Sequence, residues 1–290
     1  MAEITTAMVK QLRDRTGQSI GDCRNALKDT DGDMEQAVDL LRKKGMAVLD
    51  KRSERETREG KIVNRMSEDG KSAVLTSLCC ETDFTSKNDL FQAAAETLAD
   101  ALLQAESIPE STEALEQLTD SNGKKVADAT HEIVGTTGEK TTVGSFARFD
   151  LAGPGLLHCY VHFNGKIGTL VQIDAESDQV AGHEAVKTLA SDLAMHITAI
   201  NPVAVDRDQI DPELIEREKE VARSQVEGKP DNIIDKIVTG KINKWFQQVV
   251  LLEQPFVKDD SKTVADLVKE TGKTAGGPLT VRRFKRLQIG

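Results

Sequence analysis

The sequence predicts an α+β fold in which a small helical bundle precedes two related α+β subdomains. Apolar residues recur at helical spacing in the first 45 residues. Short apolar runs joined by Asp-Gly or Asn-Gly turns then precede a long helical pattern, and this order occurs twice. The hydrophobic share is 38% but the aromatic share only 3%. The cores are therefore built from aliphatic side chains, which suits helices packed on sheets.

The first unit, residues 1–50, is expected to hold three short helices between residues 4 and 45. Ser19 followed by Asp22 has the pattern of a capping box for the second helix. Asp33 is suited to cap the third helix, and Gly45 is expected to end it. Two interpretations of Ile20 remain open: the turn before the second helix exposes it, or the bundle buries it.

Residues 51–60 are expected to form a linker, because they contain no large apolar residue and cannot bury a core face. The first α+β subdomain is predicted to span residues 61–140. It should begin with a β-hairpin of strands near 61–66 and 72–80, turning at Asp69-Gly70. A long helix from about Asp89 and two helical stretches near 110–119 and 124–134 complete it.

The second α+β subdomain is predicted to span residues 141–290. Strands near 143–151, 156–163 and 166–174 precede a helix near 180–200. A helical hairpin is expected as an insertion at about 211–245, with Asp211 as cap and Pro212 at the first helical position. A helix near 263–270 and a last strand near 279–289 follow. The similarity between the two subdomains lies in their order of elements, without letter-by-letter repetition.

Charge argues against nucleic acid as the main partner. The net charge is -10 and the sequence pI is near 5.2, whereas phosphate binding needs clustered Lys and Arg. The basic run 282–286 is the exception, and we interpret it as a solvated strand face. The amino-terminal residues lack an apolar signal region, and no apolar stretch approaches the ~20 residues that span a bilayer. We therefore expect a soluble cytoplasmic protein with no membrane partner.

Patterns for enzyme chemistry are weak. Gly272-Lys273-Thr274 lacks the first glycine of a phosphate loop, so direct nucleotide binding is not expected. The four cysteines form no C-x-x-C pair, and no histidine belongs to an H-E-x-x-H pattern, so we expect neither a metal site nor a cofactor. A nucleophile at Cys79 or Cys80 with His158 or His162 as base stays open. A buried structural cysteine is commoner, and we expect a binding protein without catalytic residues.

The stretch Thr82-Asp83-Phe84-Thr85 stands between the apolar run that ends the first hairpin and the long helix from Asp89. Thr82 and Asp83 favour a turn because their side chains bond local backbone donors. Phe84 has two interpretations: it folds back onto its own helix as a core residue, or it protrudes into a partner.

Thr82-Asp83-Phe84 followed by Ser86-Lys87-Asn88 resembles the T-D-F-V-A-K-N signature of the bacterial elongation factor Ts family, the nucleotide exchange factors of the translational GTPase elongation factor Tu. Further similar segments follow in the family's order: residues 12–45, LAMHITAINP at 193–202, VEGKP at 226–230 and EQPFV at 253–257. The chain departs from the family at Gln18-Ser19-Ile20-Gly21, where A-G-M-M is usual, and at Thr85, where valine is usual.

The resemblance implies that the bundle is similar to a ubiquitin-associated domain and that the helical hairpin is the family's projecting coiled coil. It implies that Thr82, Asp83, Phe84 and Thr85 contact elongation factor Tu near its Mg²⁺ ion and switch region, so that GDP leaves and GTP can rebind. Arg13, Ile20 and Arg24 would grip the same GTPase domain, and His162 another domain of the partner. The alternative is an interaction module whose bundle binds nascent chains or another partner.

Overall fold

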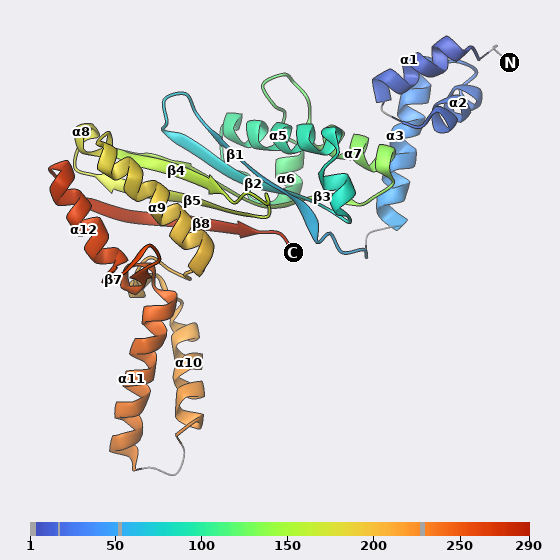
Figure 1. Ribbon diagram of the computed structural model, residues 1–290. Helices are drawn as coiled ribbons and strands as arrows, with labels where there is room; N and C mark the ends of the chain where they lie inside the picture. The colour runs from blue at the N-terminus through green and yellow to red at the C-terminus, as the bar shows by residue number, and fades with distance from the viewer. Residues whose placement is uncertain (1–3, 17, 52–53, 227–229) are drawn as a thin grey trace.

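The protein is described by a computed structural model that covers residues 4–16, 18–51, 54–226 and 230–290. Figure 1 shows a helical bundle at one end, two sheets with their helices in the middle, and a helical hairpin that projects from the body. The α+β class predicted from the sequence is confirmed.

The amino-terminal bundle consists of α1 (Thr6–Thr16), α2 (Ile20–Asp29) and α3 (Met34–Lys51). Ser19 Oγ accepts a bond from the Asp22 amide (3.1 Å) and itself donates to the Asp22 carboxylate, so the expected capping box is only half formed. Asp33 Oδ1 caps α3 by accepting from the next helical amides, as expected. The likeness to a ubiquitin-associated domain stays a prediction.

The expected end of the third helix at Gly45 is wrong, because α3 continues through it to Lys51. A glycine inside a helix costs only about 1 kcal/mol relative to alanine. The packing of α3 against α7 (Val126–Thr137) offsets a cost of that size. The bundle therefore lies directly on the body.

Two antiparallel sheets form the body. The first has the order β1 (Glu59–Met66), β2 (Ser72–Cys80), β3 (Thr141–Asp150), and the second β4 (Gly155–Val161), β5 (Ile167–Ala175), β8 (Leu279–Gln288). The boundary expected at residue 141 assigned the strand after it to the second subdomain. That assignment is wrong, because β3 pairs with β2 along its whole length.

The helices lie on the outer faces of the two sheets. α5 (Asp89–Gln104), α6 (Thr112–Glu116) and α7 cover the first sheet, and α8 (Asp178–Ala181), α9 (Glu184–Ile200) and α12 (Val264–Ala275) the second. A further apolar cluster joins the two sheets, with Ile62, Leu75, Phe149, Leu157, Leu170 and Leu287 among its members. The body is thus a four-layer stack of helices, sheet, sheet and helices.

The helical hairpin has its own small core. It consists of α10 (Pro212–Ser224) and α11 (Asp231–Val249), and Figure 1 shows both helices extending away from the sheets. Asp211 caps α10 through the Glu213 amide, with Pro212 at the helix start, as predicted. Short elements at its base complete the chain: the 3-10 turns Arg207–Gln209 and Leu251–Glu253 and the strands β6 (Pro255–Phe256) and β7 (Asp259–Thr263).

The two halves of the body repeat each other at the level of single positions. From β1 to α5, each position corresponds to one 95 residues later, since α5 begins at Asp89 and α9 at Glu184 (184 minus 89). The first-strand glycines Gly60 and Gly155 follow this rule, and each lies against a backbone carbonyl of its partner strand where no Cβ would fit. The short helices α4 (Asp83–Ser86) and α8 also correspond, with Thr82 and Ser177 as their caps.

A second correspondence relates the ends of the two halves. Positions from α7 to β3 match positions 138 residues later, since α7 begins at Val126 and α12 at Val264 (264 minus 126). The two shifts differ because the helical hairpin is inserted between α9 and α12. The hairpin is therefore an addition to the second copy of one structural unit.

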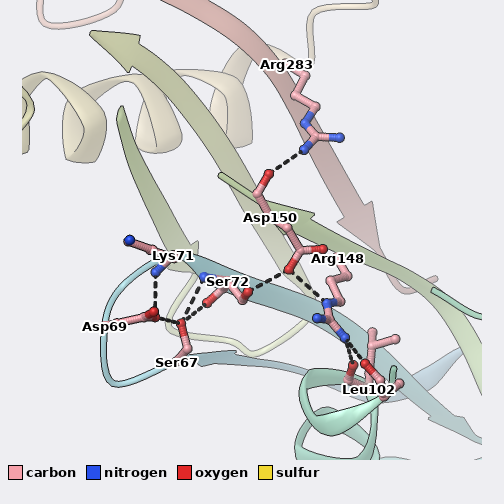
Figure 2. A network of polar contacts seen from close by, with 9 residues as sticks. Ser67, Asp69, Lys71, Ser72, Leu102, Arg148, Asp150 and Arg283 are labelled. Atoms are coloured by element: carbon pink, nitrogen blue, oxygen red, sulfur yellow. Dashed lines mark hydrogen bonds and ion pairs between the residues drawn. The ribbon is translucent and has the colours of Figure 1, made fainter. Parts of the chain in front are cut away.

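Figure 2 shows how one polar network ties these layers together. Arg148 Nη1 donates to the carbonyl oxygens of Leu102 (3.2 Å) and Ala105 (2.5 Å) at the end of α5, and its Nε donates to Asp150. The Asp150 carbonyl in turn accepts a bond from Arg283 Nη2 on β8 (3.4 Å). A single strand end thereby links a helix, the first sheet and the second sheet.

Candidate functional site

Phe84 lies on the surface of α4, immediately after the last residues of β2. Its side chain is 84% exposed, so the interpretation as a core residue is wrong. That the ring enters a partner stays a prediction. Burying a phenylalanine ring fully is worth about 1.5–3 kcal/mol, and the exposed ring of Phe84 leaves this gain available to a contact with another molecule. Phe84 is the first residue of the candidate site.

Thr82 fixes the turn that carries Phe84. Its Oγ1 caps α4 by accepting from the Thr85 amide (3.4 Å). The same hydroxyl donates to Glu139 Oε1 (2.7 Å), and the Thr82 amide donates to Glu139 Oε2 (3.1 Å). Thr85 is only 4% exposed, so its side chain supports α4 from within and does not face outward as Asp83 and Phe84 do.

Charged side chains surround the turn. Lys87 Nζ donates to Asp83 Oδ2 (2.7 Å), and this bond lowers the pKa of Asp83 below its usual range. Lys166, whose charge also acts on Asp83, pairs with Glu59 (2.6 Å). Asp83 therefore remains an anion well below neutral pH, exposed beside an aromatic ring.

The β4–β5 turn is held next to this turn by the first strand. The Ile62 amide of β1 donates to the Gly165 carbonyl (2.7 Å), and Lys166 follows directly. His162 in this turn bonds the Tyr160 hydroxyl through Nδ1 (3.1 Å), and its ring lies 4.3 Å from that of Phe163. The structure thus brings the predicted His162 to the same side of the body as Asp83 and Phe84.

Phe163 was missed by sequence reasoning. It is 92% exposed, more than Phe84. The signal was an aromatic residue directly before an Asn-Gly turn, where a polar residue would be usual. The corresponding turn of the first half has the polar pair Ser67-Glu68 at these two positions, with the same backbone bonds.

The other predicted residues lie on the bundle. Ile20 is 60% exposed at the start of α2, which settles its two interpretations in favour of the surface. Arg13 on α1 and Arg24 on α2 are exposed too. Figure 1 shows α1 and α2 at the end of the molecule, away from the β4–β5 turn. They form a second surface, separate from the Phe84 turn.

The cysteine alternative is not supported by the layers of the body. Cys80 packs in the core under α5, and Cys79 packs between the two sheets together with Cys159 of β4. His158 is the neighbour of Cys159 on β4, so its side chain points to the opposite face, away from Cys79. Burial raises the pKa of Cys80 to about 12, so its thiol stays protonated at neutral pH.

Within the described ranges no helix is long and apolar enough to cross a membrane. In the same part of the chain, no group of three or more His, Cys, Asp or Glu side chains is arranged to hold a metal ion.

The exposed rings of Phe84 and Phe163 and the anionic Asp83 are typical of a protein surface that contacts another macromolecule. The elongation factor TS family model matches residues 81–290. Elongation factor Ts of Desulfovibrio desulfuricans is 41% identical over 292 residues, covering 100% of this chain and 99% of that protein. Elongation factor Ts of Chloroherpeton thalassium is also 41% identical, over 295 residues, with 100% and 99% covered. The chain belongs to the elongation factor Ts family.

Proposed function

We propose that this protein is the guanine nucleotide exchange factor of elongation factor Tu: it binds the GDP-bound GTPase and promotes GDP release, so that GTP can rebind. The observation that carries the proposal is the exposure of Phe84 on a capped turn beside Asp83, in a member of this family. The partner, not this chain, binds the nucleotide.

An exchange factor of this kind needs no catalytic group. Bound nucleotide is held by the phosphate loop, Mg²⁺ and switch segments of the GTPase. An exchange protein that binds tightly only when these contacts are broken lowers the affinity of the GTPase for GDP. By linkage, GDP lowers the affinity of the GTPase for the exchange protein by the same ratio. Tighter binding to one conformation of the partner is therefore sufficient to promote GDP release.

In this mechanism Phe84 enters the GTPase domain as a wedge between the switch-region helices, and Asp83 approaches the Mg²⁺ site. The chemistry of the turn supports these roles. The ring of Phe84 gains by leaving water, and Asp83 brings a negative charge, which competes with phosphate oxygens for the cation. Thr82 holds both in one arrangement through its cap.

Two further contacts complete the proposed interface. Arg13, Ile20 and Arg24 on the bundle grip the same GTPase domain from a second direction, so that α4 enters at a defined place. His162, with the ring of Phe163 tilted against it, contacts another domain of the partner. Binding at separated points raises the effective concentration of the turn at the nucleotide site.

The test is the release of fluorescent GDP from elongation factor Tu. Phe84→Ala should slow the catalysed release by roughly 10- to 100-fold, because interface anchors cost about 2 kcal/mol or more on truncation. Gln179→Ala is the matched control, since Gln179 occupies the position of Phe84 in α8. Failure of the wild-type chain to accelerate release contradicts the proposal, and a pull-down that recovers no translational GTPase would favour the interaction-module alternative.

A further inference from the structure

The two halves of the body differ at one position between a helix and a strand. In the first half this position lies between α7 and β3, and in the second half between α12 and β8. In the first half α7 ends at Gly138 in a left-handed conformation, and Glu139 follows. In the second half α12 ends at Gly276 in the same conformation, and Gly277 follows. Glu139 and Gly277 are thus equivalent positions, 138 residues apart like the helices before them.

Only the first half has a carboxylate at this place. Glu139 accepts from both the amide and the hydroxyl of Thr82, as described above. The neighbouring Lys140 amide donates to Glu81 Oε1 (2.7 Å), whereas the equivalent Pro278 has no amide hydrogen to donate to Glu176. A Cβ on Gly277 would lie 2.7 Å from Glu176 Oε2 and 2.9 Å from Val180 Cγ2, so a side chain at this position would require both neighbours to move.

We propose that Glu139 is a positioning residue for nucleotide exchange: it locks the Thr82 cap so that Asp83 and Phe84 are held in one arrangement before the partner binds. This inference rests on the proposed function.

The second half shows that this type of fold forms without the two bonds between Thr82 and Glu139, here called the lock. α8 forms after Ser177, which accepts from the Val180 amide (3.3 Å), although Gly277 offers no carboxylate. The short helix and the long helix after it therefore arise without the lock. The lock occurs in the half that exposes Phe84, whereas the unlocked half has Gln179 at that position.

The chemistry of the lock requires a carboxylate. Thr82 presents two donors, its N–H and its O–H, and an ionised Glu offers an acceptor oxygen to each. The hydroxyl hydrogen is thereby committed to Glu139, which leaves an Oγ1 lone pair aimed at the Thr85 amide. A turn ordered in the free protein does not have to be ordered during binding, and this preorganisation tightens the complex.

Glu139→Gln is the test variant. An amide has one acceptor oxygen, and its NH₂ group opposes the second Thr82 donor. We expect GDP release from elongation factor Tu, measured per folded molecule, to slow by roughly 10-fold, equivalent to about 1.4 kcal/mol. Amide hydrogen exchange at Thr85 and Ser86 should accelerate in the free variant while the melting temperature stays close to that of the wild type.

A double-mutant cycle separates positioning from a general structural role. If Glu139 acts through Phe84, Glu139→Gln should add little to the defect of Phe84→Ala, because residues that act as a unit are non-additive. The control Ser177→Ala removes the equivalent cap of the second half and should leave exchange unchanged.

Three results would overturn the inference. The first is that Glu139→Gln accelerates GDP release as well as the wild type does. The second is that Glu139→Gln slows GDP release by the same factor whether residue 84 is Phe or Ala. The third is that Glu139→Gln fails to fold, which would make the carboxylate structural. Failure of the wild-type protein to accelerate GDP release from elongation factor Tu is a different result, because it refutes the proposed function itself.

Discussion

Phe84 and Phe91 are two phenylalanines of neighbouring elements with opposite environments. Phe91 on α5 is fully buried in the first core, whereas Phe84 is exposed. Phe84→Ala should therefore change the free energy of unfolding by no more than about 0.5 kcal/mol, the range of ordinary surface substitutions. Phe91→Ala should lower it by about 3–5 kcal/mol. Urea unfolding of the two variants checks this, and a large loss in Phe84→Ala would show that the ring supports the fold.

His196 is a buried residue of α9 with both ring nitrogens engaged. Nε2 donates to Gln254 Oε1 (2.9 Å), and Nδ1 accepts from the Val257 amide (3.2 Å), which is the arrangement of a neutral ring. Burial lowers the pKa of His196, against the opposing effect of the Gln254 bond. The ring thereby attaches the segment after the helical hairpin to α9.

A base whose pKa is lowered by folding stabilises the fold above its unfolded pKa of about 6.5 and loses this contribution as the pH falls towards the folded value. The wild-type protein should therefore lose stability between about pH 6.5 and 5 more steeply than His196→Leu, which cannot titrate. The variant should also be less stable at pH 7.5 by about 1–3 kcal/mol, because buried partners stay unpaired. Urea unfolding of the two proteins at pH 7.5, about 6.5 and about 5 checks this, and a parallel dependence of their stabilities on pH would contradict it.

Among the elements, the helical hairpin has a hydrophobic cluster of its own. Its buried residues, among them Val238, Ile242 and Phe246, form their own cluster. We predict that replacing residues 213–244 by a short Gly-Ser loop leaves the body folded and exchange at least partly intact, because a projecting element contributes little to the other cores. Calorimetry and GDP release check this. A collapse of the melting temperature would show that the hairpin is structural.

Helices and β-hairpins were predictable from the sequence because their signals are local. The cap at Asp211, the first β-hairpin and the start of α5 at Asp89 are as expected. The place of β3 was not predictable, because alternation reveals a strand but not its partner. The Thr82–Glu139 contact joins positions 57 residues apart and leaves no local pattern in the sequence. The candidate turn was therefore identified, but the residue that holds it was not.

At the scale of the whole molecule, the bundle and the body approach each other closely at Gln18. Gln18 is only 8% exposed, and its amide occupies the place where a Cβ on Gly135 of α7 would lie. Gly135→Leu leaves no room for the Gln18 side chain there, so the segment between α1 and α2 that carries Gln18 should move away from α7 while each unit keeps its own core. Small-angle scattering should report a larger radius of gyration.

Exchange should slow in Gly135→Leu as well, because the bundle surface and the Phe84 turn would no longer be held at one spacing. Gly240→Leu on α11 is the control, since nothing lies within 4 Å of a Cβ at Gly240. Unchanged scattering together with unchanged exchange would show that the contact yields without consequence.

The correspondence of positions 95 residues apart has a consequence for divergence and engineering. A chain built from two copies of one unit can change a recognition group in one copy while the other keeps it, as Gln179 in place of Phe84 illustrates. The short helix α8 thus occupies the place of α4 in the second half and is capped by Ser177, but it carries no exposed aromatic residue. A foreign recognition sequence grafted there would give the molecule a second specificity without altering the first.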